Sequence, residues 1–97
     1  MTAYWVTMYR AVHDPEALAR YAALAGPALV EAGATFLVRG MPEVVHEGGL
    51  MQRTIVLEFD SVEAAIAAHD GPGYQAALAE LGDGAVERDL RIVPGAE

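Results

Sequence analysis

The chain has 97 residues, which predicts one domain over residues 1–97, and 54% of these residues are apolar. Its formal net charge is −8 and it has no basic stripe, so neither nucleic acid nor a membrane surface is an expected partner. The absence of cysteine excludes disulfides and thiol chemistry, and the absence of a signal-peptide pattern or a long apolar run favours a cytoplasmic protein.

The chain begins with a predicted strand and a long helix. Residues 3–11 form an extended apolar run. Asp14 then supplies a capping oxygen, and Pro15 needs no N–H, as the first turn of a helix prefers. Pro27 predicts a kink in this helix, and Gly33 predicts its left-handed end.

Two further strands are predicted in the middle of the chain. The first covers about 34–40, and continuation beyond Pro42 as far as His46 is left open. Residues 47–49 are a turn, because glycines follow Glu47 there. The second strand covers 52–59, where β-branched and aromatic residues are frequent.

The last part of the chain predicts helix, helix and strand. Either Asp60 or Ser61 caps a helix that ends near Gly71. A short helical piece over 72–81 and a strand over 88–93 follow. The resulting order is β-α-β-β-α-β, a ferredoxin-like α+β fold with an antiparallel sheet and the helices on one face.

The predicted strands are apolar on both faces. A half-solvated strand alternates apolar and polar residues, whereas residues 3–9, 35–38 and 54–59 barely do. The helical stretches cover one face only. We therefore expect a homodimer in which two sheet faces pack together as an α/β barrel around side chains or a cavity.

Several segments in their order and spacing resemble the domain-of-unknown-function family 1330. They are Ala3-Tyr4-Trp5, Asp14-Pro15-Glu16, Tyr21, Phe36 to Gly40, Arg53 with Val56 to Phe59, Ser61 to Ala65, Pro72 with Tyr74-Gln75, and Asp89 with Ile92 to Gly95. The family is part of the dimeric α/β-barrel group of ferredoxin-like proteins. The resemblance implies a homodimer with a small-molecule pocket between helices and sheet or within the barrel. Relatives in the wider group include cofactor-independent monooxygenases, lactone isomerases, haem-binding enzymes and polyketide cyclases, and fold alone does not choose among them.

Arg39 and Glu58 are candidate catalytic residues because each interrupts an apolar strand. Alternation predicts that both point away from the helices, toward the dimer barrel. There Arg39 would hold a substrate carboxylate or enolate oxygen, and a desolvated Glu58 would transfer a proton. The alternative is a structural ion pair.

His69 is a third catalytic candidate, and four residues are predicted to bind substrate: Tyr4, Met8, Arg39 and Tyr74. The family commonly has Trp-Tyr where this chain has Ala68-His69, so His69 is expected to line the same pocket. The alternative for His69 is a solvated helix end, and the alternative for the tyrosines is a role as core aromatics.

No metal site and no cofactor are predicted, because the histidines lack ligand spacing and no phosphate loop is present. Two functions stay open. One is a cofactor-independent isomerase, cyclase or monooxygenase acting on an apolar oxygenated molecule such as a polyketide or aromatic intermediate. The other is a non-catalytic small-molecule-binding or assembly domain.

Overall fold

A computed structural model describes residues 1–96, and its elements follow the predicted order. They are β1 (Ala3–Val12), α1 (Pro15–Glu31), β2 (Thr35–Gly40), β3 (Thr54–Phe59), α2 (Val62–Asp70), α3 (Pro72–Leu81) and β4 (Val86–Pro94). The strands form one antiparallel sheet in the order β2-β3-β1-β4. The ferredoxin-like fold is therefore confirmed, with the second helical region divided into α2 and α3.

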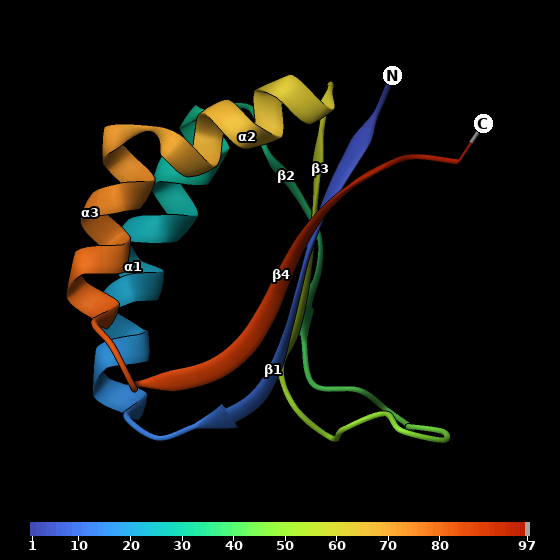
Figure 1. Cartoon of the computed structure of the whole chain (residues 1–97), viewed down its shortest axis with the longest axis vertical. Helices are drawn as coiled ribbons and strands as arrows, with labels where there is room; N and C mark the ends of the chain where they lie inside the picture. The colour runs from blue at the N-terminus through green and yellow to red at the C-terminus, as the bar shows by residue number, and fades with distance from the viewer. Residues whose placement is uncertain (97) are drawn as a thin grey trace.

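The helices cover one face of the sheet and leave the other face open (Figure 1). We call the helix-covered side the inner face and the opposite side the outer face. Buried residues alternate along β1 and β3, so Trp5, Leu57 and Phe59 lie on the inner face and are almost fully buried. Burial of side chains of this size stabilises the fold by about 1.5–3 kcal/mol each.

Side-chain caps and one glycine fix the helix ends. Asp14 accepts a hydrogen bond from the Ala17 amide at 3.1 Å, as predicted. Ser61 rather than Asp60 caps α2, with its Oγ accepting from the Ala64 amide at 3.0 Å. Gly33 has a φ of 106°, a backbone region that strains other residues, and this lets the chain turn from α1 into β2.

Residues 41–53, which we call the arm, connect β2 to β3 and project beyond the sheet (Figure 1). The arm contains no strand, so the open possibility of continuation to His46 is not realised. Pro42 lacks the N–H that a sheet ladder needs, which accounts for the end of β2 at Gly40. Apolar side chains are exposed along the arm, namely Met41, Val44, Leu50 and Met51.

A β-bulge in β2 overturns the predicted facing of that strand. Phe36 pairs with Leu57 and Val38 with Val56, so Leu37 is an extra residue between two regular pairs. An extra residue reverses the alternation of every side chain after it. Beyond the bulge, Val38 lies on the outer face and Arg39 on the inner face, opposite to the prediction from strict alternation.

Candidate functional site

A cavity of about 260 Å³ lies between α1 and the inner face of the sheet. Its walls are mostly apolar, and they include small residues of α1, core residues of β1 and β3, and three arginines. The lining residues are Trp5, Thr7, Tyr9, Pro15, Leu18, Ala19, Tyr21, Ala22, Ala25, Gly26, Leu29, Phe36, Arg39, Arg53, Ile55, Leu57 and Arg88. The volume is near the lower end of the roughly 300–1,000 Å³ of ligand pockets, which favours a small ligand.

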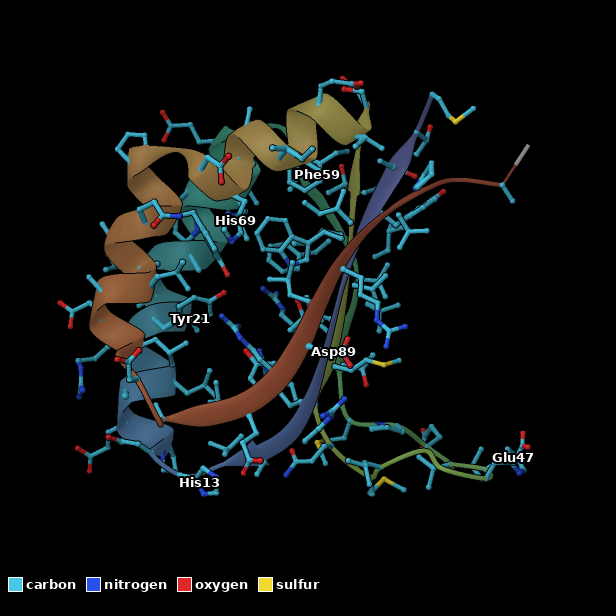
Figure 2. All side chains as sticks on the ribbon, viewed as in Figure 1. His13, Tyr21, Glu47, Phe59, His69 and Asp89 are labelled. Atoms are coloured by element: carbon cyan, nitrogen blue, oxygen red, sulfur yellow. The ribbon has the colours of Figure 1, made fainter. Side chains whose placement is uncertain are left out.

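The Arg88 side chain, which lines this cavity, makes hydrogen bonds to three tyrosines. Its Nη1 donates to the hydroxyls of Tyr9 at 3.0 Å and Tyr21 at 3.2 Å, and its Nη2 donates to the Tyr74 hydroxyl at 3.4 Å. The Tyr21 and Tyr74 hydroxyls are 2.7 Å apart and share a hydrogen bond. Tyr21 projects from α1 toward the sheet (Figure 2). The tyrosines thus fix the guanidinium beside the cavity.

Burial and this hydrogen-bonded cluster set the protonation states of its members. Burial raises the pKa of Tyr74, and Tyr21 raises it further, against the opposing effect of Arg88. Burial also raises the pKa of Tyr9, although Arg88 opposes this. For Arg88 burial lowers the pKa, but the tyrosine oxygens outweigh burial and the net shift is upward. Near neutral pH Arg88 is therefore a cation beside the neutral hydroxyls of Tyr9 and Tyr74.

The three cavity arginines have no carboxylate partner within the described residues. The ion pairs of arginine in residues 1–96 join Arg10 and Arg91 to Asp89, and Arg20 to Glu80. Arg39 instead lies over the Phe36 ring, with its Cζ 4.5 Å from the ring centroid. Arg53 precedes β3, and its carbonyl accepts from the Tyr9 amide at 3.0 Å. Three guanidinium groups therefore line one mostly apolar cavity without a carboxylate partner in residues 1–96, with Arg39 exposed and Arg53 and Arg88 half-buried.

The structure separates Arg39 from Glu58. Arg39 lines the cavity, whereas Glu58 pairs in register with Tyr4 and Thr35 and lies on the outer face. The prediction that both side chains face the same interior space is wrong, because the bulge turns Arg39 inward. Neither the predicted Arg39–Glu58 ion pair nor a shared site is present within the chain.

Tyr74 lies in the core and His69 at its edge, with a side chain that is 37% exposed, and neither is among the lining residues of the cavity. The His69 ring is 5.7 Å from Trp5 and 5.2 Å from Tyr74, measured between ring centroids, and its Nδ1 is 2.9 Å from Asp70 Oδ1. His69 points from α2 toward the sheet (Figure 2). Tyr74 is 1% exposed and reaches the cavity only through Tyr21 and Arg88.

Tyr4 and Met8 lie on the outer face, as the alternation of β1 dictates. Met8 lines a second hollow, which the outer face forms with the arm. These two residues are therefore remote from Arg39, with which they were grouped as substrate-binding residues. Their predicted role requires a ligand on the outer face.

Arg53 and Arg88 are site residues that the sequence reasoning missed. A signal for Arg88 was available, because alternation along β4 places it on the same face as Leu90 and Ile92. Arg53 is one of the residues that carry the resemblance to the family, but it precedes β3 at the end of the arm, where no alternation assigns it to a face.

Fold and sequence together identify the class and the family. The fold is a ferredoxin-like α+β fold. The chain belongs to the family described as Domain of unknown function (DUF1330), whose model matches residues 2–96. No curated protein matches the chain.

Solved structures show the same fold. The RPA0582 protein of unknown function from Rhodopseudomonas palustris is 17% identical with a TM-score of 0.76, over 99% of this chain and 83% of that one. SnoaB, a cofactor-independent oxygenase from Streptomyces nogalater, is 10% identical with a TM-score of 0.65, over 99% and 94%. A dimeric ferredoxin-like protein of unknown function from Thermobifida fusca is 19% identical with a TM-score of 0.61, over 95% and 89%.

No helix of residues 1–96 is long and apolar enough to cross a membrane. In the same residues, no three histidine, aspartate or glutamate side chains gather as a group that would hold a metal ion.

Proposed function

We propose that the protein is a cofactor-independent enzyme that acts on a small apolar, oxygenated molecule through its enolate. The observation that carries this proposal is the set of three arginines without carboxylate partners around an apolar cavity, in a chain of net charge −8. Cations in an apolar, partly desolvated space stabilise developing negative charge more strongly than water does. SnoaB, which has the same fold, is a cofactor-independent oxygenase, and this is consistent with a cofactor-independent enzyme here.

The chemistry begins with loss of a proton from a carbon next to a carbonyl group. The electron pair of the C–H bond forms a carbon–carbon double bond, and the π pair of the carbonyl group moves onto its oxygen. The proton passes to water at the cavity mouth, where Ala22 is exposed. Arg88, held by its tyrosines, stabilises the enolate oxygen. Return of a proton to a different carbon completes an isomerisation. Attack of the enolate on a second carbonyl of the same molecule instead forms a carbon–carbon bond and an alkoxide, and protonation of the alkoxide by water completes a cyclisation.

Ionisation of a 1,3-diketone tests this proposal. With 1-phenylbutane-1,3-dione as the probe, ultraviolet titration should show the bound enol ionising at lower pH than the free enol. Arg88→Gln should remove most of this shift, whereas Arg20→Gln, on the exposed Arg20–Glu80 pair, should retain it. An unshifted titration at saturating protein would contradict the proposal.

The alternative of a non-catalytic binding protein has one observation in its favour: no carboxylate or histidine lines the cavity within residues 1–96. Hydrogen–deuterium exchange at the acidic carbon of the same diketone separates the two. An enzyme accelerates the exchange beyond the rate in buffer. A binding protein retains the ligand without accelerating exchange.

We also propose that the protein is a homodimer joined through the outer face. Large apolar side chains on that face are 43–46% exposed at Met8, Val38 and Val93, and the neighbouring arm exposes four more. Exposed apolar surface of this kind is typical of protein interfaces. A second copy would cover it by isologous contact of the two sheets.

A further inference from the structure

We propose that the ligand is an elongated monoanion with a rigid apolar body, and that Gly26 limits the length of that body. The inference rests on the proposed function, because it places the anionic group of the ligand at the arginines. It adds an orientation, a ligand class and a specificity-determining residue. The cavity and the register of the strands carry it.

The cavity has a charged end and an apolar end. Arg88 pairs with Tyr9 in the sheet, and Arg39 pairs with Ile55, so these side chains lie near the end of the sheet from which the arm projects. Further along the strands, toward the opposite end of the sheet, Phe36, Leu57 and Trp5 form an apolar wall. An anionic head and an apolar body therefore match the two ends.

Gly26 lies at the apolar end. Tyr21 contacts Arg88, and Gly26 is five residues later in α1, or about 7 Å further along the helix axis. This direction leads toward Leu29 and the start of β2, where Phe36 lies. A Cβ built on Gly26 meets no atom within 4 Å. Glycine inside a helix is destabilising by about 0.5–1 kcal/mol relative to alanine, yet packing within the chain does not require it here.

Pro27 offers a competing reason for this glycine. A proline crowds the Cβ of the residue before it in helical conformation, and glycine has no Cβ. The two explanations differ in what a larger side chain does. If helix geometry alone requires Gly26, a leucine there weakens every ligand alike. If the ligand body occupies the space, a leucine weakens long ligands and leaves short ones.

The experiment measures binding of two carboxylates with the same head, benzoate and biphenyl-4-carboxylate, by calorimetry. The wild type should prefer biphenyl-4-carboxylate to its neutral amide, which tests the anion site independently of length. Gly26→Leu should weaken biphenyl-4-carboxylate by roughly tenfold or more, because overpacking is unfavourable, and should change benzoate by less than about twofold. Ala23→Leu adds the same side chain to an exposed position of α1 outside the cavity lining and should change neither.

Each result decides one question. If the wild type does not distinguish the biphenyl carboxylate from its amide, the anion site and the proposed function fail together. If it does, but Gly26→Leu weakens both carboxylates equally or neither, the length limit at Gly26 is wrong and the anion site stands. Gly26→Ala should give an intermediate loss for the biphenyl compound alone, and no such loss would likewise overturn the length limit.

Discussion

The two faces of the sheet differ in whether their arginines have carboxylate partners. On the outer face Arg10 and Arg91 pair with Asp89, which projects from β4 away from the helices (Figure 2). On the inner face Arg39 and Arg88 contact aromatic rings and hydroxyls and have no carboxylate partner in the described chain. The arginines of the outer face thus have a carboxylate partner, whereas those of the inner face have none among residues 1–96.

This difference separates structure from chemistry. Paired, exposed ions contribute little to stability, with a median of about 0–1 kcal/mol. Uncompensated guanidinium groups beside a cavity are unfavourable for folding unless hydroxyls or a ligand solvate them. The tyrosine cluster solvates Arg88, while Arg39 and Arg53 are left for a ligand or for water. The inner face therefore carries the proposed chemistry, and the outer face carries the proposed assembly.

The largest expected effect is dissociation of the proposed dimer after a substitution on the outer face. Val56→Asp places a carboxylate in each half of the proposed interface, and an uncompensated buried charge costs about 3–5 kcal/mol. Light scattering at micromolar concentration should show a dimer for the wild type and a folded monomer for this variant. Val30→Asp, on the exposed side of α1, should keep the wild-type mass. A monomeric wild type would refute the dimer.

The next largest effect is a loss of stability when the inner-face core is truncated at Leu57, the residue that follows Val56 in β3. Leu57 is 1% exposed, so Leu57→Ala leaves a cavity and should lower the free energy of unfolding by about 2–5 kcal/mol. Urea denaturation followed by circular dichroism measures the loss. The native mass should stay that of the wild type, because Leu57 faces away from the proposed interface. A loss below about 1 kcal/mol would mean that this core is poorly packed.

The order of elements and most of the inner face could be predicted from sequence, because caps and period-two alternation are local signals. Ile55, Leu57 and Phe59 face the helices as alternation requires. The facing of Arg39 could not be predicted, because the bulge at Leu37 depends on pairing with β3, which no local pattern of β2 encodes. The tyrosine cluster was equally hidden, since its hydrogen bonds join residues 14 to 79 positions apart.

A smaller effect concerns the tyrosine cluster and its pH dependence. Tyr74→Phe removes a hydroxyl that contacts Tyr21 and Arg88, so the free energy of unfolding should fall by about 1 kcal/mol near pH 7. In the wild type the folded pKa values of Tyr9 and Tyr74 are raised. Stability due to these groups is thus complete below the unfolded pKa of about 10 and is lost as the pH rises further.

Denaturation between about pH 9 and pH 11.5 measures how steeply the free energy of unfolding falls with pH. In this range only tyrosines titrate strongly, because the chain has no lysine. The loss of stability with rising pH should be shallower in Tyr74→Phe than in the wild type. Equal slopes would show that the Tyr74 hydroxyl ionises alike in the folded and unfolded chain.

The variant with the smallest expected effect, Glu58→Gln, sharpens the comparison between the faces most directly when it is set beside Arg39→Gln. Arg39 and Glu58 were predicted to share one site, yet they lie on opposite faces. Arg39→Gln removes a charge from the cavity and should weaken binding of biphenyl-4-carboxylate by about tenfold, since charge-assisted contacts are worth about 1.5–3 kcal/mol and Arg88 and Arg53 stay in place. Glu58→Gln should change that affinity by less than about twofold, because the sheet separates Glu58 from the cavity. Calorimetry on both variants makes the comparison.

Loss of binding in Glu58→Gln with retention in Arg39→Gln would move the site to the outer face, between the two sheets of the dimer, where Tyr4 and Met8 also lie.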